Sequence, residues 1–137
     1  MNIAIINGPN LNLLGTREPH IYGSETFEQY FDRLQAQFPQ CRFHYYQSNV
    51  EGELINEIQR IGFSFDGIVL NPGGYTHTSV ALGDTIAAIT TPVIEVHISN
   101  IFGREDFRKI SHVSAKAKGV ISGLGLKGYA LAVNYFL

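Results

Sequence analysis

Cysteine, tryptophan and long apolar runs are scarce or missing in this 137-residue chain. The single cysteine, Cys41, rules out a disulfide within the chain, and such cysteine usage is typical of proteins from a reducing compartment. No apolar run approaches the roughly 18 residues of a membrane-spanning helix. The N-terminal sequence MNIAIING has no basic start, and we interpret it as a buried strand and not as a signal peptide. We therefore expect a cytoplasmic protein with no membrane partner.

Charged residues are also few, at 16% of the chain, and the net charge is −2. Binding to the phosphate backbone of nucleic acids requires clustered cations, whereas the lysines and arginines here are scattered, so we expect no nucleic-acid partner. Apolar residues make up 45% of the chain, which is ordinary for a globular protein. A chain of this length fits one domain, and we predict a single domain over residues 1–137.

Several ligand-binding motifs are absent. The sequence has no phosphate-cradling G-x-x-x-x-G-K-[ST] loop, and its five histidines show no spacing typical of a metal site. Gly123, Gly125 and Gly128 do form a G-x-G-x-x-G pattern, but no second strand and no acidic ribose ligand follow them. We interpret these three glycines as parts of a tight turn and of close helix–sheet packing.

Short apolar runs alternate five times with longer amphipathic segments. Such alternation predicts a parallel sheet with helices on both faces, an α/β three-layer sandwich. For five strands in so short a chain we expect the flavodoxin-like strand order 2-1-3-4-5. The expected strands are residues 3–7, 42–47, 67–71, 92–98 and 119–122, and the later helices are residues 80–89 and 126–136.

Helix boundaries are marked by capping patterns. Thr26 with Gln29 and Ser48 with Glu51 each resemble a capping box, which predicts helices beginning next to these residues. Gly62 is the expected stop of the second of these helices.

Polar residues and glycines follow each of the first four predicted strands, at residues 7–12, 47–49, 71–77 and 97–100. Each cluster alone is consistent with an ordinary turn. In an open parallel sheet, however, ligands bind outside the carboxyl ends of the strands. Four clusters at one edge therefore favour a polar pocket for a small molecule.

Glu95, His97 and Ser99 fall on one face of the fourth predicted strand because they alternate with apolar residues. A carboxylate two residues from an imidazole can orient the ring and favour its charged form, which makes the histidine a usable general acid. The alternative interpretation is a buried structural ion pair.

Arg17 and Tyr22 lie in the long segment that follows the first strand. A loop tyrosine more often serves packing, but this segment starts at the pocket edge. Lowering a phenol pKa from about 10 to about 7 takes roughly 4 kcal/mol. A cation about 4 Å away in a dielectric of about 20 supplies a comparable amount. The pair could therefore form a phenolate base, suited to removing a proton next to a carbonyl group.

With these residues, the sequence resembles the type II 3-dehydroquinate dehydratases. The matching strings run from the first strand to the last helix, and they are NGPNLNLLGTREPHIYG, QSNVEGELINEI, GIVLNPGGYTHTSVALGD, PVIEVHISN and GVISGLGLKGYAL. The resemblance implies a flavodoxin-like subunit that uses no cofactor. It also implies dehydration of 3-dehydroquinate to 3-dehydroshikimate through an enolate, in the shikimate or quinate pathway.

The resemblance further implies a role for individual residues. Tyr22 would abstract the proton, and Arg17 would lower its pKa. His97 would protonate the leaving hydroxyl group with Glu95 behind it, and Asn12 would hold a water that stabilises the enolate. The implied substrate contacts are Asn71, His77, Ile98, Ser99 and Arg108, with Asp84 contributed by a neighbouring subunit. Subunits of the family form trimers that pack into dodecamers.

Val50, Phe102 and Gly103 depart from the residues that many family members carry at these positions. None of them falls on a catalytic position. The residues alone also leave two other interpretations open, namely a non-catalytic flavodoxin-like module that binds a small anion or a partner protein, and a nucleotide-binding regulator. The missing phosphate loop weighs against the second.

Overall fold

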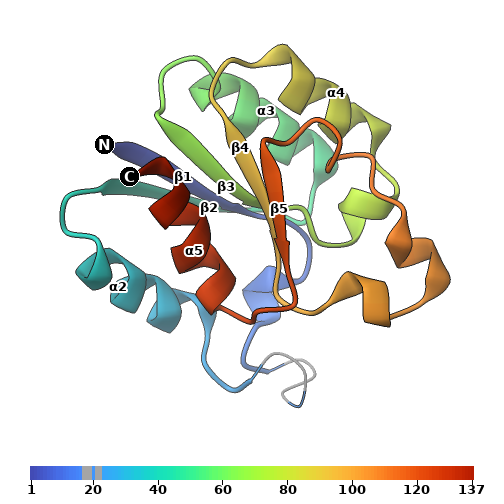
Figure 1. Ribbon diagram of the computed structural model, residues 1–137, viewed down its shortest axis with the longest axis horizontal. Coiled ribbons are helices and arrows are strands. Elements are labelled where there is room, and N and C mark those ends of the chain that lie inside the picture. Colours follow the sequence, from blue (N-terminus) through green and yellow to red (C-terminus); the bar gives the residue numbers. More distant parts are fainter. Residues whose placement is uncertain (17–19, 21–22) are drawn as a thin grey trace.

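The computed structural model describes residues 1–16, 20 and 23–137, which form a five-stranded parallel sheet of order β2-β1-β3-β4-β5 (Figure 1). This confirms the predicted flavodoxin-like α/β fold. The strands are β1 (Asn2–Asn7), β2 (Arg42–Gln47), β3 (Gly67–Asn71), β4 (Val93–His97) and β5 (Gly119–Ser122). The helices are η1 (Leu11–Leu13), α2 (Phe27–Gln37), α3 (Glu51–Ile61), η2 (Gly73–His77), α4 (Val80–Ala88), η3 (Ile101–Gly103), η4 (Asp106–Lys109) and α5 (Lys127–Phe136).

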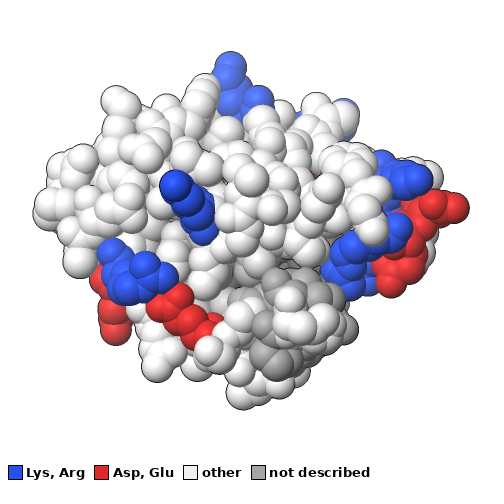
Figure 2. Space-filling view, turned by 60° about the horizontal axis from the view of Figure 1, so that its bottom comes forward, with Lys and Arg blue, Asp and Glu red and all other residues white. Residues whose placement is uncertain are grey.

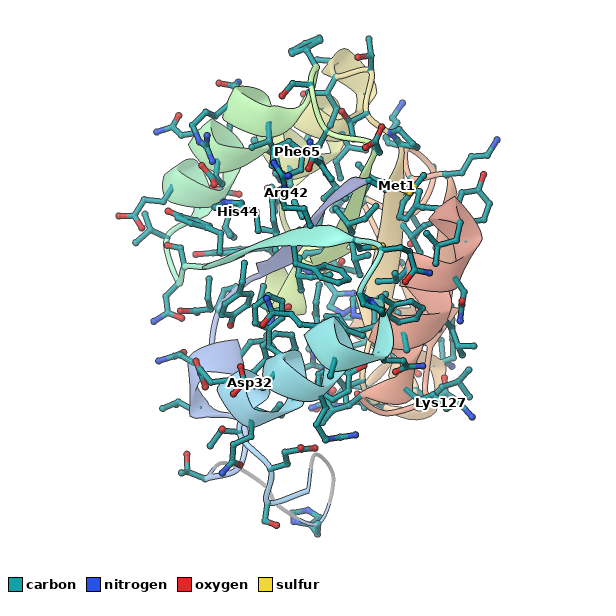
Figure 3. All side chains as sticks on the ribbon, turned by 90° about the vertical axis from the view of Figure 1, so that its left-hand side faces the viewer. Met1, Asp32, Arg42, His44, Phe65 and Lys127 are labelled. Carbon is teal, nitrogen blue, oxygen red and sulfur yellow. The ribbon has the colours of Figure 1, made fainter. Side chains whose placement is uncertain are left out.

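Helices cover both faces of the sheet, with α2 and α5 on one side and α3 and α4 on the other (Figures 1 and 3). The alternation along β1 explains this arrangement. Ile3 and Ile5 pack into the apolar cluster beneath α2 and α5, whereas Ala4 and Ile6 pack into the cluster beneath α3 and α4. All four side chains are fully buried, so neither face of β1 meets solvent.

The order of strands in the sheet changes direction at β1, because β2 lies on one side of β1 and β3 lies on the other. In the register of the sheet, Asn7 pairs with Gln47 of β2 on one side and with Asn71 of β3 on the other. Three polar residues therefore end three adjacent strands at the same level. This edge is the topological switch point, where folds of this kind bind their ligands.

One predicted capping box is confirmed and the other is wrong. At α2, the Thr26 hydroxyl accepts from the Gln29 amide at 3.2 Å, and the Gln29 side chain accepts from the Thr26 amide at 3.0 Å. At α3 the N-cap residue is Val50, because the Ser48 hydroxyl accepts from the nearer Val50 amide and donates to Glu53. Ser48 thus closes a turn before the helix and leaves its first amides uncapped.

The glycines at the start of α5 form the tight turn and the close helix–sheet contact that the sequence predicts. Gly123 and Gly125 adopt positive φ angles of +89° and +64°, which glycine tolerates without strain. A Cβ atom on Gly128 would lie 3.3 Å from Val96 Cγ1, so the absence of a side chain lets α5 approach the sheet closely.

The two edge strands of the sheet are β2 and β5, and Figure 3 views the sheet from the side of β2. His44 on this strand packs edge-on against Phe65, with the ring centroids 6.1 Å apart. In the part of the chain that the structure describes, no helix is long and apolar enough to cross a membrane.

Candidate active site

A cavity of about 130 Å³ opens at the carboxyl ends of β1, β3 and β4. It lies at the switch point of the sheet, where the sequence predicts a small-molecule pocket. The structure brings six predicted site residues together around it, namely Asn71, His77, His97, Ile98, Ser99 and Arg108. They come from β3, η2, the end of β4 with the two residues after it, and η4, so the residues of the site converge only through the fold.

Glu95 lies directly behind His97 and is fully buried. Its Oε2 atom contacts His97 Nε2 and accepts a hydrogen bond from the Thr76 hydroxyl at 2.9 Å. Its Oε1 atom accepts from the Ser114 hydroxyl at 2.6 Å. Burial alone would raise the pKa of Glu95, but the hydrogen bond and charge of His97 and the two hydroxyl donors together hold this pKa below its ordinary value. Glu95 is therefore an ionised carboxylate at neutral pH.

His77 lines the same cavity beside His97, with the two ring centroids 6.4 Å apart. His77 Nδ1 lies 2.8 Å from the carbonyl oxygen of Ile110. A carbonyl can only accept, so Nδ1 carries the hydrogen and Nε2 is left as an acceptor. Burial lowers the pKa of His77, and the charge of Arg108 adds to this effect. At neutral pH the ring is uncharged, and it can accept a hydrogen bond from a ligand hydroxyl group.

The carboxamide of Asn71 is fixed in one orientation. Its Nδ2 donates to the Tyr129 hydroxyl at 2.9 Å, and its Oδ1 accepts from the Gly73 amide at 3.0 Å. The Tyr129 hydroxyl donates in turn to Asn7 Oδ1 at 2.8 Å. Complete burial raises the pKa of Tyr129, so its phenol stays neutral and remains a donor. This buried network links the ends of β1 and β3 to helix α5.

Two guanidinium groups contribute positive charge to the cavity. Arg104 Nη1 donates to the Ser99 hydroxyl at 3.3 Å, and Arg108 pairs with Glu105 and lies over the Phe107 ring. Figure 2 turns the lower side of Figure 1 toward the viewer, and most of this face carries no charged side chain. Among the described residues, the cavity lining contains these two cations and no acidic side chain, which suits it to a small anion.

Eight further described residues line the cavity, and the sequence analysis did not assign them to the site. They are Pro9, Asn10, Leu11, Leu14, Gly73, Gly74, Ile101 and Arg104. Most fall within the polar clusters after β1 and β3, and the left-handed φ of +71° at Asn10 marks a specialised turn. Arg104 could have been found as a cation five residues after Ser99, in the segment that follows β4.

Other predicted site residues lie elsewhere. Asn12 is exposed and is not among the described residues that line the cavity; its Oδ1 accepts from Gln47 Nε2 at 3.5 Å. Asp84 lies on the exposed side of α4. Tyr22 and Arg17 lie outside the described residues. Within residues 1–16, 20 and 23–137, no group of three His, Cys, Asp or Glu side chains could hold a metal ion.

Comparisons with known proteins agree with this geometry. The family model described as "Dehydroquinase class II" matches residues 1–137. The chain is 50% identical over 136 residues to a 3-dehydroquinate dehydratase of Helicobacter hepaticus, covering 97% of this chain and 86% of the relative. It is 49% identical over 138 residues to a 3-dehydroquinate dehydratase of Bacillus licheniformis, covering 99% and 95%.

Solved structures of the same kind superpose closely. The type II dehydroquinase from Butyrivibrio crossotus matches with a TM-score of 0.95 and 46% identity, covering 99% of this chain and 97% of that one. The type II dehydroquinase from Propionibacterium acnes matches with a TM-score of 0.91 and 40% identity, covering 98% and 94%.

Proposed function

Since the chain belongs to the class II dehydroquinase family, we propose that it is a hydro-lyase that removes water from 3-dehydroquinate to give 3-dehydroshikimate. The observation that carries this proposal is the buried pair of Glu95 and His97, which opens onto a small cavity with local positive charge. A ring hydroxyl can leave as water only if it receives a proton. An imidazole backed by a carboxylate is the group that supplies one near neutral pH.

In the proposed reaction, Tyr22 as phenolate takes the proton from the carbon next to the substrate ketone, and Arg17 stabilises this phenolate. The electron pair of the broken C–H bond moves into an enolate. His97 then donates its proton to the β-hydroxyl group, the C–O bond breaks, water leaves and the conjugated enone forms. Asn12 would hold a water molecule that stabilises the enolate oxygen.

The geometry around His97 supports its role as the acid. Nε2 is directed at the ionised Glu95, so Nδ1 is the ring nitrogen available to a molecule in the cavity. The carboxylate stabilises the imidazolium form that must exist before proton transfer. Base and acid then act from different elements of the fold, which is the separation that elimination requires.

The remaining cavity residues account for binding. The neutral His77 offers Nε2 to a ring hydroxyl, and Asn71 and Arg108 contact other polar groups of the ring. The substrate carboxylate would lie against the backbone amides of Ile98 and Ser99, near the guanidinium of Arg104. These groups favour a small polyhydroxylated acid over an apolar ligand.

Subunit contacts complete the proposal. Asp84, exposed on α4, would reach the site of a neighbouring subunit, in trimers that assemble into dodecamers. The enzyme would act in the cytoplasm, in the shikimate or the quinate pathway.

Incubation of the purified protein with 3-dehydroquinate tests the function directly, because the conjugated product absorbs in the ultraviolet. We expect steady turnover, and we expect His97→Asn to lower kcat by about 10²- to 10⁴-fold, the usual contribution of a general acid. Folded protein that gives no absorbance change would overturn the proposal and favour a non-catalytic module that binds small anions.

A further inference from the structure

We propose that Thr76 and Ser114 are positioning residues for the elimination, because their hydroxyl groups fix the carboxylate of Glu95 behind His97. This inference rests on the proposed function, in which His97 is the proton donor. Neither residue lines the cavity among the described residues. Both donate to Glu95, and the Thr76 hydroxyl also lies 3.4 Å from His97 Nε2, on the side of the ring away from the proton transfer.

Both oxygens of the Glu95 carboxylate are engaged. Thr76 donates to Oε2, the oxygen that also contacts His97, and Ser114 donates to Oε1. Thr76 and Glu95 are fully buried, so water cannot replace the threonine hydroxyl without rearrangement of the site. The two hydroxyls thus leave the carboxylate one orientation, in which Oε2 faces the imidazole.

The segment that carries Ser114 is itself held in place. The amide of His112 donates to the carbonyl oxygen of Thr76 at 2.8 Å, which ties the segment to η2. A Cβ atom on Gly83 of α4 would lie 2.1 Å from the carbonyl oxygen of His112, so α4 and the segment are in close contact. The Ser111 hydroxyl accepts from the amide of Ser114 at 3.0 Å and fixes the local turn.

The same segment also supports the second histidine of the cavity. Ile110 accepts the Nδ1 hydrogen of His77, while Ser114, four residues later, holds Glu95. Residues 110–114 therefore set the hydrogen-bonding state of both cavity histidines. Two of the polar contacts of this segment therefore end at side chains of the catalytic site.

The two hydroxyls have a predictable electrostatic effect. The titratable groups near Glu95 are His97 on β4 and His77 on η2, and Arg108 of η4 acts on His77. Burial disfavours the charged carboxylate, and the hydroxyl donors offset this penalty. Without one donor, the pKa of Glu95 rises and the carboxylate stabilises the imidazolium less.

The test compares Thr76→Val with Thr91→Val. Thr91 is a matched control, because it is also buried and donates one hydrogen bond, to the Phe65 carbonyl oxygen at 3.0 Å, at the opposite end of β4. For Thr76→Val we expect kcat to fall about tenfold or more, the worth of a hydrogen bond to a charged group, with KM changed less than about threefold. Thr76→Ser, which keeps the hydroxyl, should restore kcat.

Ser114→Ala should also lower kcat with little change in KM, and it keeps the inference testable if Thr76→Val does not fold. If wild type turns over 3-dehydroquinate and both variants have the same kcat as wild type and Thr91→Val, the inference is overturned and the proposed function stands. Wild-type protein that does not turn over this substrate would overturn the proposed function, and the inference with it.

Discussion

The hydrogen-bond partners of His77 and His97 decide which atoms of each ring can meet a ligand. His77 donates through Nδ1 and therefore offers only an acceptor, whereas His97 is turned with Nε2 toward a carboxylate and can offer a proton. Two histidines whose rings stack 6.4 Å apart thus have opposite roles. The difference arises from a backbone carbonyl behind one ring and a buried carboxylate behind the other.

Tyr22 and Arg17 carry the proposed base, and a pair of variants tests them. Tyr22→Phe should lower kcat by about 10²- to 10⁴-fold, because it removes the proton acceptor, while equilibrium binding of 3-dehydroquinate survives. Arg17→Ala should raise the pH at which kcat rises, because the phenolate loses a stabilising cation. Steady-state kinetics between pH 5 and pH 10 and calorimetric binding to Tyr22→Phe provide the measurements. Near wild-type turnover by Tyr22→Phe would show that another group is the base.

Some site residues are visible in the sequence because they are local to a strand end. Asn71, His77 and His97 follow or end buried strands, and the alternation around His97 also places Glu95 behind it. Thr76 and Ser114 could not be found in this way. Ser114 lies 19 residues from Glu95, and no sequence pattern reports that the intervening chain returns to β4.

At the level of elements, the site depends on close contact between α4 and residues 110–114. Gly83→Ala should disturb this contact, because the new methyl group would lie 2.1 Å from the carbonyl oxygen of His112. The displaced segment would weaken the support of His77 and His97, so we expect kcat to fall at least about tenfold at a temperature where the variant remains folded.

Gly52→Ala is the matched control for this prediction. Gly52 lies in α3, and a Cβ atom there would have no neighbour within 4 Å. Alanine should leave activity unchanged and should stabilise the helix by up to about 1 kcal/mol. Equal loss of activity in the two variants would contradict the role assigned to the contact at Gly83.

The helix boundaries show where a local sequence pattern predicts a helix cap correctly and where it fails. The pattern at Thr26 predicts the cap correctly, because its hydroxyl and the Gln29 side chain meet within one helical turn. The same pattern at Ser48 fails, because a nearer amide, that of Val50, takes the hydroxyl first. Gly62 does follow the end of α3, but in a right-handed conformation. There a Cβ atom would collide with Ile89, so packing and not backbone freedom requires glycine.

For the whole molecule, the strand order follows from alternation of strands and helices, since right-handed crossovers allow few other arrangements. The order then determines that the ends of β1, β3 and β4 meet in one cavity. What alternation does not determine is the path of irregular chain over that cavity. This is why the contributions of Ile101 and Arg104 emerged only from the structure.

The ionised Glu95 also predicts how the stability of the whole molecule depends on pH. The folded-state pKa of Glu95 lies below its ordinary value, so its charge stabilises the fold above the unfolded pKa of about 4.3. This stabilisation is lost as pH falls through the folded pKa. Glu95→Gln cannot titrate, so its free energy of unfolding should decrease less than that of wild type between pH 6 and pH 3. Chemical denaturation across this range tests the expectation, and parallel curves for the two proteins would contradict it.

The central claim is that His97 delivers its proton to the leaving hydroxyl of 3-dehydroquinate within this cavity. A crystal structure of Tyr22→Phe with 3-dehydroquinate bound tests it most directly. The account predicts that the leaving hydroxyl lies within about 3.2 Å of His97 Nδ1, with Glu95 still on Nε2. A substrate bound outside the cavity, or bound with that hydroxyl on the face of the ring away from His97, would contradict the account.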